Sequence, residues 1–149
     1  MEEGIIHDVI QTPLKIIQVS GGDVLHAMKC DDSGFSGFGE SYFSSVDKDV
    51  VKAWKRHHSM VLNIVVPVGK IRFVLYDDRP SSPSCNKYQI FELSKENYFR
   101  LTVPPMIWMG FQGVNENINI LLNIASIPHV PEEADRKMIN EFDFDWGNT

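Results

Sequence analysis

The sequence predicts an all-β domain, a sandwich or a barrel, on three observations. Stretches rich in Val, Ile, Phe, Tyr and Leu recur at roughly ten-residue spacing, which is typical of such folds. Pro, Gly, Asn and Asp gather between these stretches. Few segments show the periodicity of an amphipathic helix. The chain of 149 residues has the usual size of one domain, so we assign 1–149 to a single domain.

The strands are expected in a dense series. Leu14–Val19 predicts the first strand, the pair Gly21–Gly22 ends it, and Asp31–Glu40 should be loop because it is rich in Asp, Ser and Gly. The later strands alternate with short turns and are expected at Ser41–Phe43, Val50–Trp54, Met60–Pro67, Lys70–Tyr76, Tyr88–Leu93, Tyr98–Val103, Ile107–Phe111 and Asn117–Ile124.

The C-terminal segment changes character after Pro131. Pro131–Asn140 carries acids near its start and predicts a helical turn or two. Phe142–Trp146 alternates apolar and acidic residues, which suits either an added edge segment or a cover over the mouth of a barrel. A short helical or irregular segment is therefore expected after the strands.

Composition narrows the class of protein. A hydrophobic fraction of 43% and a charged fraction of 23% are ordinary for a soluble globular protein. The net charge of −6 disfavours general nucleic-acid binding but leaves room for a local basic pocket that holds one phosphate ligand. Cys30 and Cys85 make no disulfide framework, no signal peptide is visible, and the apolar stretches are too short to span a bilayer. We expect a cytoplasmic protein.

Five phrases of the sequence, taken in order, resemble one family. They are Gly39–Ser44, Val51–His57, Val74–Ser84, Leu101–Phe111 and His129–Glu133. This set is similar to the cupin-fold nucleotide-sugar epimerases related to dTDP-4-dehydrorhamnose 3,5-epimerase. The resemblance implies a jelly-roll β-barrel, usually a homodimer that exchanges or pairs N-terminal strands. It implies a nucleotide-diphospho-4-keto-6-deoxy sugar as ligand, and proton removal and return beside the keto group without metal or other cofactor, in surface-polysaccharide or deoxysugar biosynthesis.

The sequence departs from the family pattern at three positions. Lys55 stands where the family has its catalytic histidine, and Asn123 stands near the place of its catalytic tyrosine. Met109 replaces a histidine that often precedes the Gly-Phe pair. Either the reaction differs, or other residues carry it, or the chain only binds its ligand.

The stretch from Trp54 to His58 holds the richest set of ionisable candidates. On a strand, Lys55 and His57 share one face, while Trp54, Arg56 and His58 share the other. His57 could act as base or acid, and Lys55 as a proton carrier or a cation beside the keto oxygen. With Asn123, these are the candidate catalytic residues; the alternative is a polar strand end that faces water. Adjacent His57 and His58 point apart, which argues against a shared metal ion.

Five residues besides the catalytic candidates are expected to bind substrate, namely Tyr42, Lys52, Asn63, Arg72 and Trp108. Asn63 and Asn123 are polar within apolar runs, so each either is a satisfied core amide or bonds the sugar. Lys52 and, if it faces the interior, Arg72 would suit a diphosphate. Tyr42 and Trp108 could stack on a base or sugar, although large aromatic residues are often core.

Three functions remain open at this point. The first is a metal-independent epimerase or isomerase of a nucleotide-linked 4-keto-6-deoxy sugar. The alternative is a catalytically inactive cupin that binds a sugar or sugar nucleotide as a sensor or partner subunit. A metal-dependent cupin isomerase or oxygenase is the third.

Overall fold

The computed structural model describes residues 1–147, and within them the chain is nearly all β, as the sequence predicts. Two short 3-10 turns, η1 (Pro131–Glu133) and η2 (Ile139–Glu141), follow the barrel. No helix in residues 1–147 has the length and apolar composition needed to cross a membrane. The strands are β1 (Glu2–Glu3), β2 (Ile10–Pro13), β3 (Ile16–Ile17), β4 (Val24–Leu25), β5 (Glu40–Ser45), β6 (Val51–His57), β7 (Leu62–Val68), β8 (Lys70–Asp77), β9 (Lys87–Ser94), β10 (Phe99–Val103), β11 (Trp108–Gly113), β12 (Ile120–Ala125) and β13 (Ala134–Arg136).

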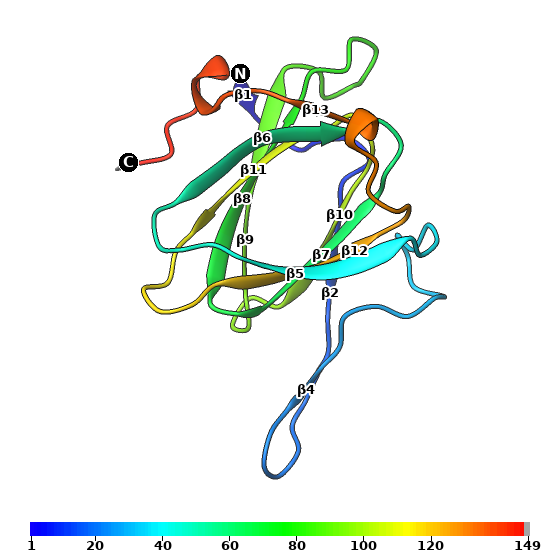
Figure 1. The fold of residues 1–149 in the computed structure, drawn as a ribbon, viewed down its shortest axis with the longest axis vertical. Helices are drawn as coiled ribbons and strands as arrows, with labels where there is room; N and C mark the ends of the chain where they lie inside the picture. Colours follow the sequence, from blue (N-terminus) through cyan, green and yellow to red (C-terminus); the bar gives the residue numbers. More distant parts are fainter. Residues whose placement is uncertain (148–149) are drawn as a thin grey trace.

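The strands form two facing sheets with the jelly-roll order (Figure 1). One sheet has the order β1-β9-β8-β11-β6-β13 and the other β2-β10-β7-β12-β5. Early and late strands are therefore neighbours in both sheets, which confirms the expected cupin-type barrel. Gly69 connects β7 to β8 with a φ of 78°, a left-handed conformation that glycine adopts without steric cost.

Alternation along the strands fills the space between the sheets with apolar side chains. On β8, Ile71, Phe73 and Leu75 point inward and are fully buried. Leu62 and Ile64 on β7 join them from the opposite sheet. This core occupies one part of the barrel, and the cavity described below lies beside it.

The N-terminal strand differs from the expectation. Leu14–Val19 is not one strand: β2 ends at Pro13 and pairs with β10, whereas β3 pairs with β4 in a hairpin that extends away from the barrel (Figure 1). The following loop covers the outer face of the five-stranded sheet. Buried Arg100 holds this loop by donating to the carbonyls of Ala27 at 2.8 Å and Ser33 at 3.1 Å.

The C-terminal segment lies on the outer face of the six-stranded sheet and not over the barrel mouth. Its apolar side chains Phe142, Phe144 and Trp146 pack against Trp54 of β6, with ring centroids 5.3–6.4 Å apart. Gly110 of β11 permits this approach, because a Cβ there would lie 2.9 Å from the Trp146 ring. The alternating apolar residues of Phe142–Trp146 thus cover the outer face of the six-stranded sheet.

Removing the Trp146 side chain should destabilise the fold. Trp146 is 4% exposed, so Trp146→Ala is expected to lower the free energy of unfolding by about 3 kcal/mol, the low end for a buried tryptophan because a surface segment can partly collapse. Denaturant titration measures the change. Met138→Ala, on the same segment but 71% exposed, is the control and should cost under about 0.5 kcal/mol. Equal losses in the two variants would contradict the packing described.

Candidate active site

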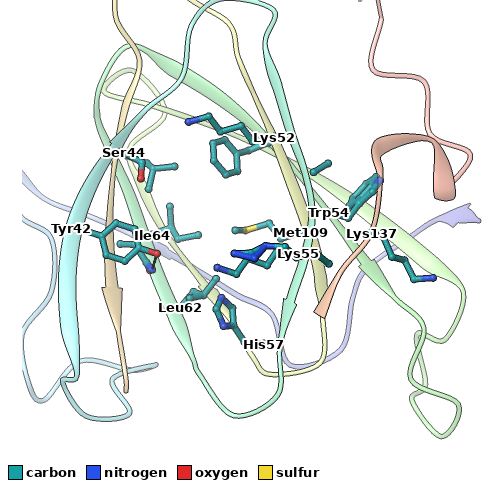
Figure 2. A pocket seen from close by; sticks show the side chains of 15 residues that line it. Tyr42, Ser44, Lys52, Trp54, Lys55, His57, Leu62, Ile64, Met109 and Lys137 are labelled. Carbon is teal, nitrogen blue, oxygen red and sulfur yellow. Dashed lines mark hydrogen bonds between the residues drawn. The ribbon is translucent and has the colours of Figure 1, made fainter. Parts of the chain in front are cut away.

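A cavity of about 450 Å³ opens between the two sheets (Figure 2). Strand β6 forms one wall, and β5 with β12 forms the other. Its floor is apolar and consists of Leu62, Ile64, Met109, Phe111 and Leu121. The polar lining comes from Tyr42, Ser44, Lys52, Lys55, His57, Asn123, Arg136 and Lys137. A cavity with an apolar floor and a few polar side chains that point into it is typical of a small-molecule site.

A β-bulge turns the basic residues of β6 into this cavity. Regular alternation would place Lys52 and Lys55 on opposite faces. However, Lys52 pairs with Phe111 and Lys55 pairs with Met109, so β6 has one more residue than β11 over the same span. Both lysines therefore line the cavity together with His57. The structure therefore confirms that Lys55 and His57 lie on the same face of β6, as predicted.

Sheet pairing also brings in an arginine from the end of the chain. Arg136 on β13 is the register partner of Lys55, so the two side chains stand beside each other on the cavity face. Within residues 1–147, Lys55 makes no ion pair or hydrogen bond. Burial and the neighbouring Arg136 charge lower the pKa of Lys55. No Asp or Glu of the described residues lines the cavity, so an acidic protein has a locally basic site that favours an anion.

His57 is held by a carboxylate behind it. Its Nδ1 lies 2.7 Å from Oε2 of Glu133, and both side chains are largely buried. The other carboxylate oxygen, Oε1, accepts the backbone N–H groups of Ser59 at 2.8 Å and Met60 at 2.9 Å. These bonds fix the carboxylate, which in turn fixes the imidazole ring.

The protonation of this pair follows from its surroundings. Burial alone would raise the pKa of Glu133, but the Ser59, His57 and Met60 hydrogen bonds outweigh it and bring that pKa to about 2. The carboxylate is thus ionised and accepts the proton on Nδ1 of His57. Burial lowers the pKa of His57 despite the opposing effect of Glu133. At neutral pH the ring is therefore neutral, with Nε2 as its free basic nitrogen.

The opposite wall carries an amide and a phenol. Asn123 on β12 is the register partner of Tyr42 on β5, and its Nδ2 donates to the Tyr42 hydroxyl at 2.9 Å. Asn123 is buried, and its Oδ1 has no partner among the described residues. Figure 2 shows Tyr42 pointing toward the side of the cavity where Lys55 and His57 lie. The structure thus brings these predicted residues into one site.

Three predicted binding residues lie outside the cavity. Asn63 alternates with the inward Leu62 and Ile64, so it points outward, where its amide donates to Gly34 O at 3.0 Å and accepts from Thr102 Oγ1 at 2.6 Å. Of the two alternatives for Asn63, the structure supports the satisfied amide, which anchors the N-terminal loop, and not the sugar contact.

Arg72 and Trp108 belong to the outer face of the six-stranded sheet. Arg72 donates through Nη2 to Gln112 Oε1 and to Trp146 O, each at 2.6 Å, and so holds the C-terminal segment. Trp108 donates to Asp78 Oδ2 at 2.9 Å, with the Arg56 guanidinium 4.6 Å from its ring centre. The expected diphosphate contact of Arg72 and stacking role of Trp108 are therefore corrected to structural roles.

Sequence reasoning missed Glu133 and Arg136. Glu133 lies 76 residues after His57, and only the pairing of β13 with β6 brings the two together. Glu133 did stand within one of the five family-like phrases. Arg136 carried no local signal, because its side chain faces the cavity only through long-range register. Within residues 1–147, no three His, Cys, Asp or Glu side chains gather closely enough to hold a metal ion.

The two pKa shifts predict a bell-shaped pH profile for any reaction that uses this site. His57 accepts a proton only when neutral, so kcat/KM should fall as pH drops through its pKa, which lies below the ordinary 6.5. If the Lys55 cation is needed, kcat/KM should fall again at a pH below the ordinary lysine value of 10.5. Lys55→Arg keeps the charge and should move only the basic limb upward. An acidic limb centred above 6.5 would contradict the burial argument for His57.

The chain resembles several known proteins and solved structures. A crystal structure described as a dTDP sugar isomerase from Desulfovibrio desulfuricans G20 shares 38% identity and a TM-score of 0.92, over 95% of this chain and 92% of that one. A structure of dTDP-4-dehydrorhamnose 3,5-epimerase from Sulfolobus tokodaii shares 25% identity and a TM-score of 0.83, over 96% of this chain and 84% of that one. A probable low-salt glycan biosynthesis epimerase of Haloferax volcanii is 28% identical over 136 residues, 90% of this chain and 87% of that one. No protein-family profile matches.

Proposed function

The chain belongs to the family of nucleotide-sugar epimerases and isomerases related to dTDP-4-dehydrorhamnose 3,5-epimerase, and from that membership we propose that it acts on a nucleotide-linked 4-keto-6-deoxy sugar. The reaction is proton transfer at a carbon beside the keto group, and its product enters glycan or polysaccharide synthesis. The alternative of a catalytically inactive binding protein finds no support, since the relatives are described as epimerases and isomerases.

The observation that carries this proposal is the His57–Glu133 pair at a basic cavity. Removing a proton beside a carbonyl requires a positioned base and a positive charge near the oxygen that becomes an enolate. Nε2 of His57 is the base, because Glu133 holds the proton on Nδ1. Lys55 shares the cavity face with His57 and supplies the charge at the keto oxygen. The family's histidine position is thus taken by a cation, and the base stands two residues later.

The remaining cations suit the diphosphate of a sugar nucleotide. Lys52 lies at the exposed end of the same wall, where its ammonium donates to Ser45 O at 2.9 Å. The planar guanidinium group of Arg136 can bind phosphate oxygens through two hydrogen bonds. Placed along β6 in the order Lys52, Lys55, His57, these groups orient the nucleotide toward the solvent-exposed end and the sugar toward His57.

A homodimer in the cytoplasm completes the proposal. The projecting β3–β4 hairpin exposes Ile17, Val19 and Val24, and Phe43 on the edge strand β5 is 70% exposed. Apolar side chains in such positions are the kind that a second copy covers. Light scattering on the purified chain distinguishes twice the 17.0 kDa mass from the monomer.

Mass spectrometry of the sugar in heavy water tests the proposed reaction. With dTDP- and GDP-linked 4-keto-6-deoxyglucose, the protein should raise the mass of the sugar by one unit for each carbon that exchanges its proton. The matched 4-hydroxy sugars lack the acidifying carbonyl and should gain nothing. If no keto sugar nucleotide gains mass above a protein-free control, the proposed function is wrong.

A further inference from the structure

We infer that Asn123 is a specificity-determining residue, whose carbonyl oxygen Oδ1 accepts a hydrogen bond from a ring hydroxyl of the sugar. The inference rests on the proposed function for the identity of the ligand as a sugar nucleotide, and it adds the residue that recognises the sugar ring. It is carried by the burial of Asn123, by the missing partner of its Oδ1 and by the character of the cavity wall on which it lies.

Asn123 differs from the other buried asparagines of the described chain. Asn63 uses both ends of its amide, as described above. Asn119 donates through Nδ2 to Val46 O at 3.1 Å, and its Oδ1 accepts the backbone N–H of Lys70 at 2.9 Å. Asn123 is 3% exposed, yet nothing among residues 1–147 donates to its Oδ1. A buried acceptor without a donor costs free energy, so this one points to a partner that the chain itself does not supply.

The surroundings of Asn123 leave the cavity as the direction from which a donor can come. The buried side chains of β12 alternate and include Asn123, which therefore points between the sheets. Its register partner on β7 is Ile64, which has no polar side-chain atom. Its partner on β5 is Tyr42, whose hydroxyl already accepts the Nδ2 hydrogen. All three residues line the cavity, so a ligand bound there is the group that can supply the donor.

The chemistry of this wall selects a hydroxyl group. A carboxamide oxygen only accepts, so it does not bind phosphate or enolate oxygens, which carry no hydrogen. Those oxygens suit the cations Lys52 and Lys55 on the facing wall; Figure 2 shows Tyr42 and Ser44 on the side opposite Lys55. In a 4-keto-6-deoxyhexose, the hydroxyls at C2 and C3 are the hydrogen donors. Asn123 thus recognises the sugar and transfers no proton, because a carboxamide does not titrate near neutral pH.

Dissociation constants of unreactive ligands test this contact without any need for turnover. The probes for calorimetric titration are dTDP-linked 6-deoxyglucose, its 2-deoxy and 3-deoxy analogues, and dTDP alone, or the GDP series if the GDP-linked keto sugar is the one that exchanges. Wild type should bind one of the two deoxy analogues about 20-fold more weakly than the parent sugar, because the loss of that hydroxyl leaves Oδ1 without its donor.

Asn123→Leu removes the acceptor with little change in size. It should bind the parent sugar about 20-fold more weakly than wild type does, and should bind the discriminated deoxy analogue as well as it binds the parent. Its affinity for dTDP, which lacks the hexose, should stay within about twofold of wild type. This pattern assigns the loss to one hydroxyl and not to the cavity as a whole.

Thermal stability separates this role from a structural one. Leu at position 123 removes an unpartnered buried oxygen, so the melting temperature should not fall. Asn63→Leu is the matched control, since it leaves Gly34 O and Thr102 Oγ1 without their hydrogen bonds. It should lower the melting temperature by about 5 °C and leave the affinities for dTDP and for the sugar within about twofold of wild type.

Every outcome decides for or against the contact. Equal affinity of wild type for all three sugars overturns the inference, and so does an Asn123→Leu loss that is the same for every sugar. A matching loss for dTDP also overturns it, because Asn123 would then act on the nucleotide or on the fold. Binding with the expected pattern by a protein that exchanges no substrate proton supports the contact and refutes the proposed reaction alone. A protein that binds none of these ligands overturns both.

Discussion

Replacing His57 with Asn is expected to lower kcat/KM by about 10³-fold, since a positioned general base contributes about 10²–10⁴-fold. Asn keeps a polar group near Glu133 but has no basic nitrogen at the position of Nε2. The loss should fall on kcat, because the cations proposed to bind the diphosphate remain. Steady-state kinetics on the keto sugar nucleotide identified by mass spectrometry measures the change.

The neighbouring histidine provides the control. His58 follows the last residue of β6 and does not line the cavity; its Nε2 is 2.9 Å from Asp135 Oδ1. His58→Asn should retain kcat/KM within about twofold. A comparable loss in both variants would show that the chemistry depends on this strand's integrity and not on His57.

Replacing Glu133 with Gln is expected to cost nearly as much activity with almost no change in size. The amide can face its oxygen toward Ser59 and Met60, but then its NH₂ faces Nδ1 of His57, and the ring must shift its proton to Nε2 to accept. That tautomer presents a donor to the cavity in place of a base. A carboxylate-to-amide change beside a catalytic histidine lowers kcat by about 10⁴ in a serine protease, and about 10³ is expected here.

The same variant should change stability with a defined pH dependence. The pKa of Glu133 in the fold is about 2, below its ordinary 4.5, so its stabilising effect is present above about pH 4.5 and lost as pH falls toward 2. Wild type should therefore be more stable than Glu133→Gln at neutral pH, and the difference should shrink on acidification. Glu132→Gln, exposed next to it, is the control for both measurements. Full activity in Glu133→Gln would disprove the tautomer argument.

The sequence predicted the barrel because each strand carries its own signal. The apolar stretch Lys70–Tyr76 and the short turn before it are local features, and the structure has both, as β8 and the turn at Gly69. Alternation likewise placed Lys55 and His57 on one face of β6. By contrast, the first strand was misassigned, since the pairing of β2 with β10 depends on contacts far along the chain.

The site was only partly predictable for the same reason. Alternation puts Arg72 on the face of its strand opposite to Ile71 and Phe73, but it does not say which face is the interior. The structure places Arg72 on the outer face, where its apolar neighbours are buried beneath the C-terminal segment. Glu133 and Arg136 reach the site through the register of β13 on β6, which no local pattern encodes. The bulge that turns Lys52 inward is likewise a property of the β6–β11 pairing.

Proton NMR of the keto sugar nucleotide in heavy water, with wild type, His57→Asn and His58→Asn side by side, tests the role of the His57–Glu133 pair most directly. The expected result is loss of a ring-proton signal beside the keto group with wild type and His58→Asn, and a rate about 10³-fold slower with His57→Asn. Exchange by His57→Asn at the wild-type rate would mean that another group removes the proton, and would contradict the mechanism proposed for this cavity.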